Sequence, residues 1–136
     1  MVLETPLEMW IKYAEEYLGI TNYVSDKILV NYNSWFASEQ YRKELLYEIT
    51  PEWKFTDDGI NDVFDYGYGS TFDMRNFDGK GHEMKVLDRW EHLIGLDDVK
   101  QSFVNIVRKH PTFLDNVKKI FTSLDVDGIY NSIIGK

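Results

Sequence analysis

Three side chains near the middle of this 136-residue chain have types and a spacing that could support chemistry. They are Arg75, Asn76 and His82. A histidine whose pKa lies near neutrality can remove a proton from a hydroxyl group, and the planar cation of an arginine can bind the charge that develops on a phosphate. These residue types would therefore suit phosphoryl transfer without a metal ion.

The same three residues resemble the active-site motif of HEPN-type ribonucleases, which are small all-helical proteins. The resemblance covers eight residues, and it implies that His82 would help to activate a ribose 2′-hydroxyl group while Arg75 steadies the phosphate. The chain departs from the family pattern because an aspartate and two glycines between Arg75 and His82 predict a turn. A metal-independent ribonuclease that uses Arg75, Asn76 and His82 is one alternative function.

A second candidate site is the acidic segment, residues 44–78, in which aromatic residues are interspersed among carboxylates. It contains nine acidic residues and only two basic ones, Lys54 and Arg75. Such a field repels nucleic-acid phosphates and attracts the lysine and arginine side chains of a protein. Aromatic side chains add contact area at a low entropic cost. The predicted partner-binding residues are Glu48, Glu52, Trp53, Asp57, Asp58, Asp62, Asp65, Tyr66 and Tyr68.

The charge of the whole chain favours the same interpretation. Residues 1–82 contain 15 acidic and 7 basic residues, whereas residues 83–136 contain 8 of each, so the net charge of −8 lies in the first part. This composition resembles that of small acidic inhibitors and immunity proteins of bacteria and phages. We therefore predict a cytoplasmic interaction module of the inhibitor or immunity type that binds a basic protein and makes no direct contact with nucleic acid.

A third hypothesis is a structural or assembly component of a larger particle, with the apolar Ile133 and Ile134 in the contact between copies. We expect no cofactor and no metal site, because the chain has no cysteine, no phosphate loop and no HExxH motif. It also has no basic apolar leader and no apolar run of about 18 residues, so neither export nor a membrane span is expected.

Apolar residues at helical spacing predict an all-α fold, a single domain over residues 1–136 that forms a bundle of about six or seven helices. The pattern predicts helices over residues 6–18, 39–49, 86–94, 97–110, 111–124 and 125–134. Caps are expected at Thr5, Ser38, at Asp97 or Asp98, and at Asp125 or Asp127. Over residues 26–36 the pattern favours a helix capped by Ser25 or Asp26, although the composition would also suit a strand.

The periodicity is weaker between residues 52 and 82. Residues 60–66 could form a short helix with Ile60, Val63 and Phe64 facing inward, and a small β-hairpin could lie between residues 66 and 82. A segment of this length without regular structure is uncommon inside a compact domain and is often functional.

Overall fold

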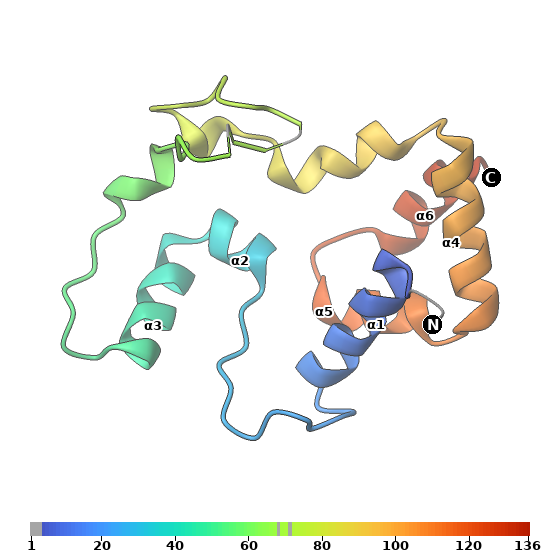
Figure 1. Cartoon of the computed structure of the whole chain (residues 1–136), viewed down its shortest axis with the longest axis horizontal. Helices are drawn as coiled ribbons and strands as arrows, with labels where there is room; N and C mark the ends of the chain where they lie inside the picture. Colours follow the sequence, from blue (N-terminus) through green and yellow to red (C-terminus); the bar gives the residue numbers. More distant parts are fainter. Residues whose placement is uncertain (1–3, 68, 71) are drawn as a thin grey trace. The chain divides into compact units, whose positions relative to one another are not determined.

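The structure is a computed structural model that describes residues 4–67, 69, 70 and 72–136 (Figure 1). Its α-helices are, in chain order, α1 (Pro6–Tyr17), α2 (Tyr32–Ala37), α3 (Glu39–Ile49), α4 (Asp97–Lys109), α5 (Phe113–Ile120) and α6 (Val126–Ile134). The described residues between α3 and α4 also form the 3-10 helices η1 (Asp58–Asn61), η2 (Gly81–Glu83) and η3 (Val86–Leu93). The described ranges contain no β-strand, and the predicted all-α class is confirmed.

The chain divides into two compact units. The central unit is Val30–Arg89, which includes α2, α3, η1 and η2. The terminal unit consists of residues 4–29 and 90–136 and includes α1, α4, α5 and α6. The boundary falls inside η3. The grouping of the whole chain into a single domain stays a prediction.

The first helix begins as its sequence predicts. The Thr5 hydroxyl oxygen accepts a hydrogen bond from the Glu8 backbone N–H at 3.2 Å, and the Glu8 carboxylate accepts one from the Thr5 N–H at 2.9 Å. This capping box satisfies two backbone donors that a helix start leaves free, and Pro6 occupies a position where its missing N–H costs nothing. Glu8 also pairs with Lys109 of α4, and that contact, followed by the hydrogen bonds from Thr5, lowers the pKa of Glu8 to about 2.

The terminal unit is built on an apolar core. Ile11 of α1, Ile106 of α4 and Phe113 of α5 are buried together. The Trp10 ring meets Phe113 edge-on, with centroids 5.5 Å apart, in the geometry that aromatic pairs prefer. In Figure 1, α1 lies beside α5. Helix α6 adds three further buried side chains, Val126, Ile133 and Ile134. These three positions are seven and eight residues apart, so they lie on one face of α6.

The helix predicted over residues 26–36 is wrong for its first six residues, because α2 begins only at Tyr32. Its cap is Asn31, whose side chain accepts from the Ser34 N–H at 3.2 Å, and not Ser25 or Asp26. No strand replaces the missing helical turns between residues 26 and 31, all of which the structure describes.

A carboxylate of α1 binds several residues of the loop that precedes α2. The Glu16 side chain accepts hydrogen bonds from the Thr21 hydroxyl at 2.7 Å and from the N–H groups of Tyr23 and Val24 at 3.0 and 3.1 Å, and it pairs with Lys27. These four donors lower the pKa of Glu16 to about 2, with Lys27 as the largest cause. The loop is therefore fixed by a residue whose partners lie five to eleven positions further along the chain.

Several helix boundaries also differ from prediction. Helix α5 ends at Ile120 and not at Leu124, because Phe121 leaves the helical conformation and a turn follows at Thr122 and Ser123. The N-cap of α4 is Leu96, which makes no side-chain cap bond, so the predicted caps at Asp97 and Asp98 are wrong. The predicted caps at Thr5, Ser38 and Asp125 are confirmed. Residues 86–93 form the predicted helix, but with 3-10 geometry.

Turns occupy most of the described residues between 62 and 80. The short helix predicted over residues 60–66 is replaced by η1, which ends at Asn61. In place of a hairpin, the described residues from 66 to 82 contain one isolated bridge, between Ser70 and Met74. Gly69 has a φ of +80°, and a Cβ there would lie 2.0 Å from the Met74 carbonyl oxygen, so this close approach requires glycine.

The central unit has little apolar core. Val86 is the only buried apolar side chain among its described residues. Helices α2 and α3 lie side by side (Figure 1) and meet at Ser38, whose hydroxyl oxygen accepts from the Tyr41 N–H at 3.1 Å. No helix within the described ranges has the length and apolarity needed to cross a bilayer.

Candidate interaction surface

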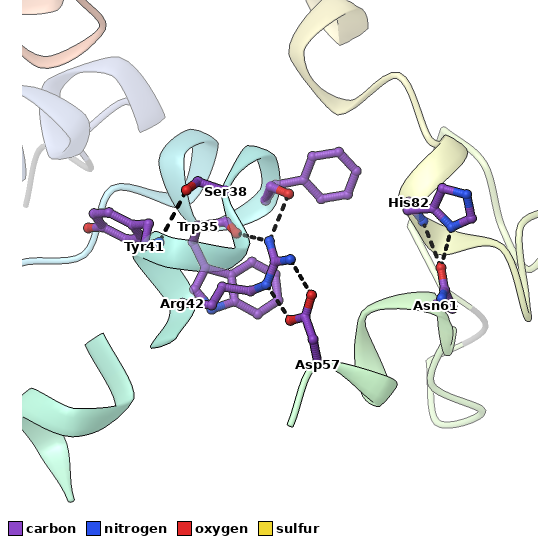
Figure 2. A network of polar contacts seen from close by, with 8 residues as sticks. Trp35, Ser38, Tyr41, Arg42, Asp57, Asn61 and His82 are labelled. Atoms are coloured by element: carbon purple, nitrogen blue, oxygen red, sulfur yellow. Dashed lines mark hydrogen bonds and ion pairs between the residues drawn. The ribbon is translucent and has the colours of Figure 1, made fainter. Parts of the chain in front are cut away.

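An ion pair between Arg42 and Asp57 organises the central unit (Figure 2). Nε and Nη2 of Arg42 donate to the two carboxylate oxygens of Asp57 at 2.6 and 2.5 Å. Nη1 donates to the carbonyl oxygens of Trp35 and Phe36 at 2.6 and 3.0 Å. The Arg42 side chain is only 10% exposed. A bidentate pair of this kind is among the stronger polar contacts in proteins.

This pair changes the role of one predicted partner-binding residue. Its hydrogen bonds raise the pKa of Arg42 and lower the pKa of Asp57. Asp57 thus stays ionised and joins the chain after α3 back to α2 and α3. The structure places Asp57 among the residues that hold the unit together, so its charge is already neutralised.

A groove lies next to the pair, between α3 and residues 55–60. Its volume is about 410 Å³. Most of the lining is apolar and comes from Leu45, Leu46, Ile49, Phe55 and Ile60. Arg42, Asp57 and Gly59 also line it. The size and the mainly apolar lining are typical of small binding sites.

Four of the predicted acidic residues are exposed and have no partner among the described side chains. They are Glu48, Glu52, Asp58 and Asp62. Within the part of the chain that the structure describes, no ion pair and no side-chain hydrogen bond engages their carboxylates. Asp58 stands between Asp57 and Gly59, both of which line the groove, and Glu48 precedes the lining residue Ile49.

Large aromatic side chains are exposed in the same segment. Trp53 is 63% exposed, Phe64 78% and Tyr66 90%. The prediction that Phe64 faces inward is wrong, because the helix that would have turned it inward ends at Asn61. Tyr68, also a predicted site residue, lies outside the described residues. Aromatic side chains of this size can supply contact area when a surface binds a partner.

Arg75 lies between two carboxylates. Its guanidinium pairs with Asp65 and donates to Asp78 at 2.5 Å. Asp78 in turn accepts from the Val63 backbone N–H at 3.1 Å, and this bond, followed by the contact with Arg75, lowers the pKa of Asp78. The arginine of the ribonuclease-like motif is therefore already balanced by two acids, and Asp65 is a second predicted site residue with an internal partner.

His82 is held by a residue outside the motif. Asn61 Oδ1 accepts a hydrogen bond from the His82 backbone N–H at 3.3 Å and contacts the ring Nδ1 (Figure 2). Among the described residues, no hydrogen bond or ion pair joins His82 to Arg75 or Asn76. The structure thus connects Arg75 and His82 to other partners and not to one another.

Sequence reasoning missed Arg42 and Arg89 as organising residues. Arg89 donates to Asp73 at 2.6 Å and lies over the Phe72 ring at 5.4 Å. In both ion pairs the partners are 15 or 16 positions apart. The only signal in the sequence was the small number of cations in and beside a strongly acidic segment. This scarcity indicates that each cation would pair with a carboxylate, but it does not indicate which carboxylate.

Comparison with known proteins gives no match to a protein-family model, to a curated protein or to a solved structure. In the described ranges, no group of three or more His, Cys, Asp or Glu side chains is arranged so that it could hold a metal ion.

Proposed function

We propose that this protein is a non-enzymatic interaction module whose central unit binds a basic protein. One observation carries the proposal. The three arginines of the central unit, Arg42, Arg75 and Arg89, are all paired internally, while Glu48, Glu52, Asp58 and Asp62 keep exposed and unpaired carboxylates among the described residues. The unit has 12 acidic residues against 7 basic ones, so an excess of negative charge remains for a partner.

The exposed aromatic residues support the same proposal. Trp53, Phe64 and Tyr66 lie in the same acidic segment as the free carboxylates. Carboxylates accelerate the encounter with a basic protein and orient it, and aromatic side chains supply most of the affinity once water is excluded. We do not propose Asp57 and Asp65 as partner contacts, because each is paired with an arginine of the same unit.

An inhibitor or immunity-type role in the cytoplasm of a bacterium, or in a phage, is the biological setting that this chemistry fits best. Such a protein neutralises a basic enzyme or toxin by covering its cationic surface. The assembly hypothesis has less support, because Ile133 and Ile134, its proposed contact residues, are 5% and 3% exposed within the terminal unit.

The ribonuclease alternative also has less support. Two carboxylates next to Arg75 would repel the phosphate that this residue should bind. Purified protein that cleaves RNA, and loses that activity in a folded His82→Ala variant, would favour the ribonuclease over the interaction module.

The proposal is tested by charge reversal. Basic proteins retained by the immobilised chain from a lysate of its source cells at low salt would be purified and their association rates measured. We expect Asp58→Lys with Asp62→Lys to slow association about tenfold or more, because steering depends on the local field. The matched control is Asp26→Lys with Glu91→Lys, which makes the same change in net charge at exposed positions of the terminal unit.

In the control double variant, we expect an association rate close to that of the wild type. Equal rates for both double variants and the wild type, at every salt concentration, would contradict the proposal.

A further inference from the structure

We propose that the groove between α3 and residues 55–60 receives a large apolar side chain from a lysine- and arginine-rich segment of the partner. This inference rests on the proposed function and adds the kind of segment that the partner must offer. The groove has room for a leucine or an aromatic ring, at about 410 Å³, and its apolar lining gives such a side chain a favourable transfer from water.

The groove is preformed in the chain without a partner. At one side of the groove, Arg42 donates hydrogen bonds to the carboxylate of Asp57 and to the carbonyl oxygens of Trp35 and Phe36. Because these contacts fix the segment 55–60 against α3, binding costs little ordering of the chain. A preformed apolar groove favours a short anchor over a large induced interface.

The state of Arg42 decides the charge of the occupant. An arginine in a groove would ordinarily suggest an anionic ligand. Here Nε, Nη1 and Nη2 of Arg42 already donate to internal acceptors, and Asp57 balances its charge. A carboxylate or phosphate ligand would therefore gain little from Arg42 and would be repelled by the unpaired acids nearby.

Those acids favour cations beside the apolar anchor. Asp58 lies between two lining residues, and Glu48 is next in sequence to the lining residue Ile49. Both carboxylates are exposed and have no partner among the described side chains. An apolar side chain flanked by lysine or arginine satisfies both features at once: the anchor leaves water, and the cations stay solvated at the acidic edge.

Gly59 offers a way to block the groove without disturbing the backbone. It lines the groove, its φ lies outside the left-handed region, and a Cβ added there meets no atom within 4 Å. Gly59→Trp should cover the groove, and Gly59→Ala is the matched control that leaves it open. A second variant, Ile49→Gln, makes the lining polar at a position that is already 53% exposed, so folding should be retained.

The probes are fluorescent synthetic peptides with four lysines on each side of two central positions, which are either Leu-Leu, Phe-Leu, Ala-Ala or Gly-Ser. All four peptides carry the same charge. We expect the Leu-Leu or Phe-Leu peptide to bind the wild-type chain at least about tenfold more tightly than the Ala-Ala peptide. Gly59→Trp and Ile49→Gln should reduce that ratio to twofold or less, and Gly59→Ala should preserve it.

The possible failures are distinguishable. If all four peptides bind equally, and binding weakens with salt, the groove inference is overturned while the proposed function stands. If none binds, both are overturned. Sedimentation of the chain alone tests another occupant: a wild-type dimer that Gly59→Trp converts to a monomer would assign the groove to a second copy and would overturn the inference.

Discussion

The terminal and central units reach a defined structure by different means. In the terminal unit, helices α1, α4 and α5 bury Ile11, Ile106 and Phe113 against one another. In the central unit, Val86 is the only described apolar side chain that is buried, and arginine–carboxylate pairs connect segments that are distant in sequence. The stability of the terminal unit against unfolding therefore comes mainly from removing apolar surface from water. The stability of the central unit depends more on directed polar contacts.

This difference lies in how the segments are held together and not in how much apolar surface is exposed. Aromatic side chains are exposed in both units, with Tyr13 and Tyr23 in the terminal unit and Trp53 and Tyr66 in the central unit. In the central unit, arginine–carboxylate pairs connect the segments that a buried apolar cluster connects in the terminal unit. We expect the central unit to be less stable than the terminal unit. It should be destabilised by different substitutions from those that destabilise the terminal unit, and it should lose stability in acid.

The largest expected effect comes from breaking the apolar core. Phe113→Ala should destabilise the terminal unit by about 3–5 kcal/mol, because Phe113 is only 4% exposed and its removal leaves a cavity. Amide hydrogen exchange of α4 would report the loss. The control is Tyr13→Ala, an aromatic residue of α1 that is 72% exposed and should cost no more than about 0.5 kcal/mol. Similar losses in both variants would mean that the terminal unit has no such core.

A smaller effect is expected from removing the main ion pair of the central unit. Arg42→Met should cost about 2–3 kcal/mol, because Asp57 and two carbonyl oxygens lose their donor in a partly buried place. Exchange of the α3 amides would measure it. Lys43→Met is the matched control on the same helix, since Lys43 is exposed and makes no ion pair with a described residue. Equal exchange of the α3 amides in Arg42→Met and Lys43→Met would contradict the proposed difference between the two units.

The smallest effect per residue is expected from acid. The pKa values of Asp57 and Asp78 are lowered in the folded chain, so their stabilising effect is complete above the ordinary aspartate value of about 3.9 and is lost as the pH falls through their folded values. Between pH 6 and pH 2.5, exchange corrected for its intrinsic rate should increase in α3, because Asp57 loses its charge beside Arg42. The terminal unit should lose protection in acid as well, because the pKa values of Glu8 and Glu16 are lowered to about 2. Unchanged protection of α3 over this range would mean that its ion pair does not stabilise the central unit.

The elements that sequence reasoning predicted well are those whose signals are local. Helix α1 followed from Thr5, Pro6 and Glu8, because a capping box joins residues three positions apart. Helices α4 and α5 followed from apolar residues at the 3.6-residue period. One prediction that failed involves a distant partner: residues 26–31 belong to a loop in which Glu16 of α1 accepts from the Val24 N–H and pairs with Lys27.

The candidate site shows the same limit. Its acidic and aromatic composition was visible in the sequence, and so was the scarcity of cations. The separation of its acids into paired and unpaired ones was not visible, since Asp57 and Asp58 are neighbours in the chain and differ only in whether Arg42 reaches them. The inward placement of Phe64 failed for a related reason: the short helix that it assumed does not extend past Asn61.

The sequence by itself thus determined the all-α class, most helices and the excess of negative charge between residues 44 and 78. Periodicity, capping and composition depend on residues within about one or two helical turns, so they can be read along the chain. Only the tertiary structure decided which carboxylates are neutralised, which aromatic side chains stay exposed and where a groove opens. These features depend on contacts between segments that the path of the chain brings together, and no local pattern specifies that path.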